Sequence, residues 1–138
     1  MQSRPKAVVI DDMEFCRDFL TDLLQERGYQ VSSFDSARSF VVCAAAEERC
    51  PYTQPCADLV LLDNQMPGLS GIDFLTQQRA KGCQLKASQF AIFSGSWTPD
   101  EEKCVENFGC QIFSKPYDVN ALFNWLDNLP KLNQTIPA

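Results

Sequence analysis

Short runs of apolar residues alternate along this chain with longer segments in which apolar residues recur at helical spacing. A short apolar run is typical of a strand buried on both faces of a sheet, and a period near 3.6 is typical of a helix that packs on one face. The expected strands are Lys6–Ile10, Gln30–Phe34, Leu59–Leu62, Phe90–Phe93 and Gln111–Phe113. Strands that alternate with helices predict an α/β fold, a doubly wound parallel sheet with helices on both faces.

The helical segments carry signals at their ends. Cys16 opens a set of apolar residues at helical spacing that runs to Leu24, and Gly28 follows where a C-terminal cap is expected. Thr98 is the expected N-cap of a helix over 99–108, with Pro99 at its first position. The other expected helices cover 36–48, Ile72–Lys81 and Val119–Leu126, with a Pro-rich loop over 48–57.

The charge balance narrows the choice of partners. Twelve Lys and Arg against eighteen Asp and Glu give the 138 residues a net charge of −6, which argues against nonspecific binding to nucleic acid or to an anionic membrane. No apolar stretch approaches the ~20 residues that a membrane helix needs, and Asp11 interrupts the first apolar run too early for a secretory signal. We expect one domain over 5–129, a tail or linker stub over 130–138, and a cytoplasmic location.

The absence of histidine excludes several kinds of chemistry within this chain. Ser–His–Asp and Cys–His nucleophiles, His-ligated zinc and an internal phosphohistidine relay all need that residue. The seven cysteines include no C-x-x-C pair, which argues against zinc-knuckle and thioredoxin-like sites. Only Cys50 and Cys56, which flank the Pro-rich loop, are a candidate disulfide, and reduced thiols are the expectation in the cytosol.

Polar residues follow the expected strands at the points where they end. Asp11 and Asp12 follow the first strand, Asp63 the third and Lys115 the fifth, while Ser94 ends the fourth. Open α/β sheets bind ligands at this carboxyl edge. If the first and third strands are neighbours, three carboxylates meet there, and Mg²⁺ is the natural cation to offset their repulsion. A carboxylate is itself a nucleophile toward phosphorus, and a lysine and a hydroxyl suit the oxygens of a phosphoryl group.

Four segments together resemble one known family, the receiver domain of two-component response regulators. They are Val8–Asp12, Leu61–Gly71, Ala91–Gly95 and Phe113–Pro116, and they follow the family's order at near its usual spacing. The resemblance covers roughly residues 5–129. It implies a flavodoxin-like (βα)5 sheet with strand order 2-1-3-4-5, the order that the family's chemotaxis member illustrates.

The resemblance also implies a role for each matching residue. Asp63 corresponds to the phosphoacceptor, Asp12 to a direct Mg²⁺ ligand, and Asp11 to a ligand that acts mainly through water. The backbone carbonyl of Gln65 completes the implied metal site. We therefore expect Mg²⁺ to be the cofactor.

Further implied roles concern the switch and the lifetime of the phosphorylated state. Ser94 corresponds to the hydroxyl that moves toward the phosphoryl group, and Lys115 to the family's lysine, with a cis bond to the proline that follows it. Gln65 and Ser96, each two residues after a site residue, are expected to adjoin the phosphoryl group and tune its lifetime. Trp97 is expected to report Mg²⁺ or phosphoryl binding by fluorescence.

Two departures from the family pattern stand out. The aromatic residue that the family usually has three positions before the lysine is replaced by Ile112, with Phe113 one place later, so coupling through an aromatic side chain is in question. The loop over 49–57 lengthens the spacing from Asp12 to Asp63, away from the carboxyl-end crevice of the expected fold.

The resemblance implies a signalling switch. A histidine kinase or a histidine phosphotransfer protein would donate the phosphoryl group, and a downstream effector would read the response. Such a domain is not an enzyme in the turnover sense, because it catalyses only its own phosphorylation and dephosphorylation.

Three alternatives remain open. One is a degenerate receiver that acts as a phosphorylation-independent binding module. Another is a Mg²⁺-dependent phosphohydrolase, although haloacid-dehalogenase-like enzymes need Asp-x-Asp where this chain has Asp11-Asp12-Met13. A flavodoxin-like electron carrier is the third, although the acidic loop would repel the phosphate of FMN.

Overall fold

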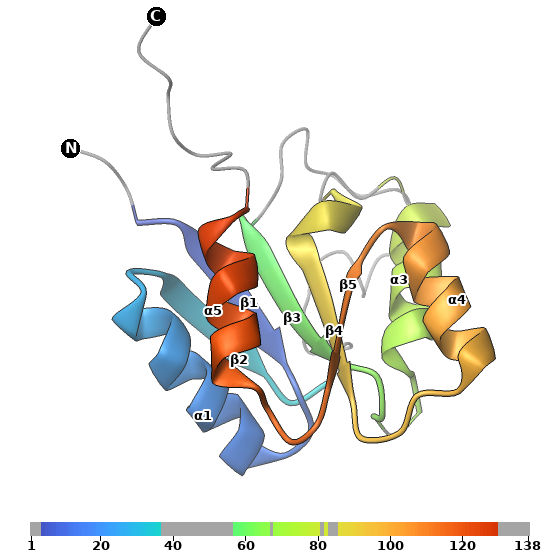
Figure 1. Cartoon of the computed structure of the whole chain (residues 1–138), viewed down its shortest axis with the longest axis horizontal. Helices are drawn as coiled ribbons and strands as arrows, with labels where there is room; N and C mark the ends of the chain where they lie inside the picture. Colours follow the sequence, from blue (N-terminus) through green and yellow to red (C-terminus); the bar gives the residue numbers. More distant parts are fainter. Residues whose placement is uncertain (1–3, 37–56, 67, 81, 83–85, 130–138) are drawn as a thin grey trace, which may run out of the picture.

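Five parallel strands form one sheet in the order β2-β1-β3-β4-β5 (Figure 1). The computed structural model describes residues 4–36, 57–66, 68–80, 82 and 86–129. The strands are β1 (Lys6–Ile10), β2 (Gln30–Phe34), β3 (Leu59–Asp63), β4 (Phe90–Ser94) and β5 (Gln111–Ser114). The prediction of five strands in a doubly wound parallel sheet is confirmed, including the strand order.

Four α-helices and one 3₁₀ turn accompany the described strands, and the last helix follows β5. They are α1 (Glu14–Glu26), α3 (Gly71–Ala80), α4 (Pro99–Phe108), α5 (Val119–Asp127) and the 3₁₀ turn Ala87–Gln89. These match the four helices expected from the apolar spacing at the same places, to within a residue or two at their ends. Four expected features lie outside the described residues, the first two almost entirely: the helix over 36–48, the loop over 48–57, the tail over 130–138 and the Cys50–Cys56 pair.

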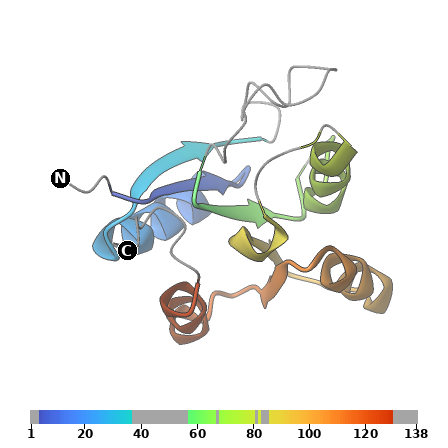
Figure 2. The same cartoon turned by 90° about the horizontal axis from the view of Figure 1, so that it is seen from above.

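The two faces of the sheet carry separate cores, because side chains alternate along each strand. On one face, Ala7 and Val9 of β1 pack with apolar residues of α1 and α5, including Leu20 and Leu122. On the other face, the β1 residues between and beyond them pack with α3 and α4 through Phe74 and Val105. Figure 2 shows α1 and α5 on one side of the sheet and α3 and α4 on the other.

The helix ends follow the local signals of the sequence. Thr98 Oγ1 accepts a hydrogen bond from the backbone N–H of Glu101, and the Glu101 side chain accepts one from the N–H of Thr98, so a capping box starts α4. Gly28 follows the C-cap of α1 with φ +91°, the left-handed conformation that favours glycine. In the part of the chain that the structure describes, no helix has the length and apolar character to span a bilayer.

Candidate functional site

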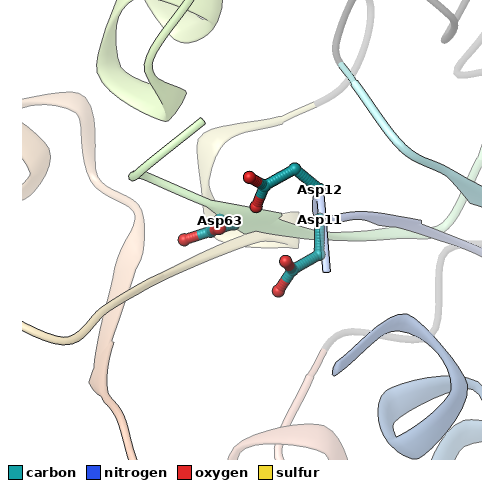
Figure 3. A group of neighbouring side chains, drawn as sticks. All are labelled: Asp11, Asp12 and Asp63. Atoms are coloured by element: carbon teal, nitrogen blue, oxygen red, sulfur yellow. The ribbon is translucent and has the colours of Figure 1, made fainter. Parts of the chain in front are cut away.

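The strand order brings the acidic residues together. Ile10 of β1 lies opposite Leu62 of β3, so Asp11 and Asp63 come next on neighbouring strands at the same edge of the sheet. One carboxylate oxygen each from Asp11, Asp12 and Asp63 lies within 4.8 Å of the others (Figure 3). Asp11 and Asp63 are only 2% and 3% exposed, whereas Asp12 is exposed. Two buried charges and one exposed charge therefore share a single site.

Lys115 supplies a positive charge to this cluster. It follows β5, and its Nζ lies 3.3 Å from Asp11 Oδ2 and 3.4 Å from Asp63 Oδ1. Burial lowers the pKa of Lys115, but Asp63 and Asp11 outweigh that effect and leave the pKa above its ordinary value. The amine is therefore an ammonium at neutral pH. The Lys115–Pro116 peptide bond is cis, as predicted.

The positive charge of Lys115 does not fully offset the negative charge of the carboxylates. Burial and the charge of Asp11 raise the pKa of Asp63 to about 6, even though Lys115 and the N–H of Gln65 act in the opposite direction. Three carboxylates face one ammonium, and every ligand atom in the cluster is an oxygen. An all-oxygen, anionic set of this kind fits a hard divalent cation such as Mg²⁺. The cluster could therefore hold the metal that the sequence led us to expect.

Ser94 lies at the carboxyl end of β4, beside the acidic cluster. Phe93 is opposite Asp63 in the sheet, and Ser94 is the next residue along β4. Its side chain is fully buried, and Oγ donates to the carbonyl of Ser96 at 3.1 Å and accepts from the N–H of Ser96 at 3.2 Å. The hydroxyl is thus held by the turn that follows its own strand.

Gln65 connects the loop after β3 to the loop after β4. Its backbone N–H donates to Asp63 Oδ1 at 3.1 Å. Its side chain reaches the other loop, where Oε1 accepts from the N–H of Gly95 and Nε2 donates to Ser96 Oγ, both at 3.2 Å. The two residues expected to tune the phosphoryl group, Gln65 and Ser96, are therefore in direct contact.

Two residues that the sequence analysis passed over hold Asp11 in place. Tyr117 Oη lies 3.5 Å from Asp11 Oδ2, and Arg17 Nη1 donates to the backbone carbonyl of Asp11 at 2.8 Å. The Tyr117 ring stacks on Phe19 with 5.3 Å between ring centroids, and burial is the main cause of its raised pKa. The sequence signal for Tyr117 was an aromatic residue two positions after Lys115. Whether its side chain points toward Asp11 depends on how α1 packs on the sheet.

An indole joins the loop after β4 to β5. Trp97 is partly buried, and its Nε1–H donates to the carbonyl of Phe113 at 2.9 Å. Ile112, which occupies the position where an aromatic residue was expected, packs partly buried against the same core cluster as Trp97. The loop after β4 therefore contributes an aromatic side chain to the face of the sheet on which Ile112 lies.

Comparison with known proteins places the chain in a family. The sequence profile described as "Response regulator receiver domain" matches residues 7–127. The chain belongs to this family, and the resemblance inferred from its motifs is confirmed.

Individual relatives agree with that assignment. Sensory/regulatory protein RpfC of Xanthomonas campestris is 30% identical over 126 residues, which cover 90% of this chain and 16% of that protein. The chain thus spans about a sixth of the length of this relative. Sporulation initiation phosphotransferase F of Bacillus subtilis is 25% identical over 117 residues, which cover 85% of this chain and 86% of that protein.

Solved structures show the same fold. A response regulator receiver protein from Pseudomonas putida superposes with a TM-score of 0.73 at 25% identity, covering 94% of this chain and all of that one. Chemotaxis protein CheY4 of Vibrio cholerae also gives a TM-score of 0.73, at 21% identity, and covers 93% of this chain. The flavodoxin-like fold predicted from the motifs is therefore confirmed.

Proposed function

We propose that this receiver domain is a phosphorylation-dependent switch that accepts a phosphoryl group on Asp63. The observation that carries the proposal is the placement of Asp63 beside the carboxylates of Asp11 and Asp12 and within 3.4 Å of the ammonium of Lys115. Receiver domains act with kinases and effectors in two-component signalling. The proposed donor is a histidine kinase or a histidine phosphotransfer protein, and its histidine lies outside this chain, which has none.

The transfer is a substitution at phosphorus. A carboxylate oxygen of Asp63 forms a bond to phosphorus as the P–N bond to the donor imidazole breaks, and the imidazole nitrogen keeps the electron pair. Lys115, 3.4 Å from Asp63, is placed to offset negative charge on the phosphoryl oxygens. The Ser94 hydroxyl is proposed to donate a hydrogen bond to a phosphoryl oxygen after transfer, in place of its present bonds with the backbone of Ser96.

The proposed cofactor is Mg²⁺. The carboxylates of Asp11, Asp12 and Asp63 and the backbone carbonyl of Gln65 would hold it. When bound, Mg²⁺ adds the positive charge that the site lacks and neutralises charge on the phosphoryl oxygens. The number of carboxylates relative to the single ammonium supports this proposal.

Two exposed apolar side chains support the proposal that a protein donates the phosphoryl group. Among the described residues, the large hydrophobic side chains most open to solvent are Met13, 55% exposed, and Phe15, 77% exposed. Met13 directly follows Asp12, and Phe15 lies two residues further on, in the first turn of α1. Exposed apolar side chains beside a reactive group suit docking of a protein surface.

We propose that the domain turns over no other substrate and catalyses only its own phosphorylation and dephosphorylation.

Intact mass spectrometry tests the proposal. Wild type and Asp63→Asn would be incubated with a small acyl phosphate, with Mg²⁺ or with a chelator. We expect one added phosphoryl group on wild type, with Mg²⁺ only, and none on Asp63→Asn.

A wild type that gains no mass, while binding Mg²⁺ normally, would contradict the proposal. That result would instead favour a phosphorylation-independent binding module. Ile112→Tyr would then be the first variant to make, because that position departs from the family pattern.

A further inference from the structure

The residue after the proposed phosphoacceptor, Asn64, is buried and bonded on every side. Asn64 is only 3% exposed. The backbone N–H donates to the carbonyl of Phe93 at 2.8 Å, and the backbone carbonyl accepts from the N–H of Gly71 at 3.1 Å. The backbone of Asn64 is thus bonded to β4 through its N–H and to the start of α3 through its carbonyl.

The side-chain amide of Asn64 joins two helix starts. Its Oδ1 accepts from the N–H of Ile72, in the first turn of α3, at 3.1 Å. Its Nδ2 donates to Glu101 Oε2, in the first turn of α4, at 3.1 Å. Asn64 therefore connects the position next to Asp63 to both helices that cover this face of the sheet.

Glu101 divides its two oxygens between Asn64 and the cap of α4. Oε1 accepts from the N–H of Thr98 at 3.1 Å, while Oε2 accepts from Asn64. The bonds from Thr98 and Asn64 lower the pKa of Glu101, the backbone N–H of Thr98 contributing most. The carboxylate is therefore ionised at neutral pH and holds both donors.

The start of α3 packs closely against the loop after β3 and is held to Asn64 by two hydrogen bonds. A Cβ added to Gly71 would lie 3.0 Å from Asn64 Cα and 3.0 Å from the carbonyl oxygen of Asp63. Because glycine has no Cβ, the start of α3 can lie this close to the backbone of Asp63 and Asn64. Glu101 is only partly buried, so the bond from Asn64 to α4 is the connection with more freedom to change.

We propose that Asn64 is a positioning residue through which phosphorylation of Asp63 changes the first turn of α4. The inference rests on the proposed function and adds the route by which the site reaches the protein surface. Added volume and charge on Asp63 displace the adjoining backbone of Asn64, whose carbonyl is bonded to the first residue of α3. The Asn64 amide then moves relative to Glu101, and because a buried amide left unbonded is costly, Glu101 and the cap of α4 move with it.

One substitution is expected to remove the hydrogen bond between Asn64 and Glu101 while keeping the capping box of α4. Glu101→Gln keeps an oxygen for the N–H of Thr98, since Gln also serves in a capping box. Its amide nitrogen then faces Asn64 Nδ2, and two donors cannot bond. Glu102→Gln is the matched control, because it removes the same charge one residue later, on an exposed position of the same helix turn.

The experiment is backbone amide NMR with and without a small acyl phosphate and Mg²⁺, together with intact mass on the same samples. We expect all three proteins to gain the phosphoryl group. Wild type and Glu102→Gln shift the resonances of residues 98–102, and Glu101→Gln shows those shifts reduced severalfold.

Each other outcome counts against the inference in a distinguishable way. Wild-type shifts in phosphorylated Glu101→Gln would overturn the route through Asn64 and leave the proposed function standing. A wild type that gains no phosphoryl group would overturn the proposed function, and the route with it. Equal loss of the shifts in Glu102→Gln would assign the effect to helix charge and also overturn the route.

Discussion

The ammonium of Lys115 lies 3.4 Å from Oδ1 of Asp63, although the two residues come from the ends of different strands. The same nitrogen lies 3.3 Å from Asp11 Oδ2. One cation therefore serves two buried carboxylates, and a second cation at the site must bind against its repulsion. Lys115 and a bound metal thus compete electrostatically for the same negative charge.

Lys115→Met should bind Mg²⁺ more tightly than wild type. Removing the ammonium leaves the carboxylates more negative, and we expect a gain of about threefold to tenfold at pH 8, corresponding to about 1 kcal/mol. Isothermal titration calorimetry measures it. Lys103→Met, on an exposed position of α4, is the control and should leave the affinity unchanged. Equal or weaker binding by Lys115→Met would show that the ammonium does not oppose the metal.

Asp63→Asn should stabilise the metal-free domain at pH 8. The pKa of Asp63 is raised from 3.8 to about 6 in the folded state, so the folded state binds the proton more tightly than the unfolded chain. The stability that goes with this proton is complete below pH 3.8 and is lost as pH rises through about 6. At pH 8 the ionised carboxylate destabilises the fold, and we expect the variant to be about 1–3 kcal/mol more stable.

Urea denaturation in the presence of a chelator, at pH 8 and at pH 4.5, measures this difference in the free energy of unfolding between the variant and wild type. The extra stability of Asp63→Asn over wild type should shrink as the pH falls, and saturating Mg²⁺ should reduce that extra stability at pH 8. Asp22→Asn, on the exposed side of α1, is the control for loss of a negative charge. A variant less stable than wild type at pH 8 would mean that Lys115 outweighs burial and Asp11.

Gln65→Ala combined with Ser96→Ala should shorten the lifetime of the phosphorylated state. The Gln65 side chain spans the two loops beside Asp63 through Gly95 and Ser96, and its removal opens a path for water to phosphorus. We expect decay of the added mass, after the acyl phosphate is removed, to be severalfold faster than in wild type. An unchanged rate would remove both residues from control of the lifetime.

Trp97 should report the state of the site. The chain has two tryptophans, so Trp125→Phe leaves Trp97 as the sole indole emitter. Its Nε1–H is bonded to the carbonyl of Phe113, and it lies three residues after Ser94, so movement of that loop changes the surroundings of the ring. We expect its emission to change on addition of Mg²⁺ or acyl phosphate. An emission spectrum identical before and after saturation with both would contradict the prediction.

Much of the site could be predicted because it depends on where strands end. Asp11 and Asp63 follow or end buried apolar runs, Lys115 follows the partly exposed strand β5, and parallel strands end at one edge of a sheet. Given the strand order implied by the family motifs, their meeting required no knowledge of side-chain packing. The cap at Thr98 was predictable for a similar reason, since its partner lies three residues away on the same chain segment.

Contacts between side chains on different elements could not be predicted in this way. The bond from Asn64 to Glu101 spans 37 residues, and the contact of Tyr117 with Asp11 spans 106. Asn64 read alone is an ordinary turn residue, and Glu101 an ordinary member of a capping box. Their pairing depends on the distance at which α3 and α4 pack on the sheet.

The sequence by itself determined the alternation of strands and helices, the cap of α4 and the family, because apolar spacing and short motifs act locally along the chain. Only the tertiary structure decided which polar groups are buried together, how Gln65 bridges two loops and which two helices Asn64 joins. These contacts form only once the sheet and both helix layers are packed, since a difference of a few tenths of an ångström decides whether a hydrogen bond exists.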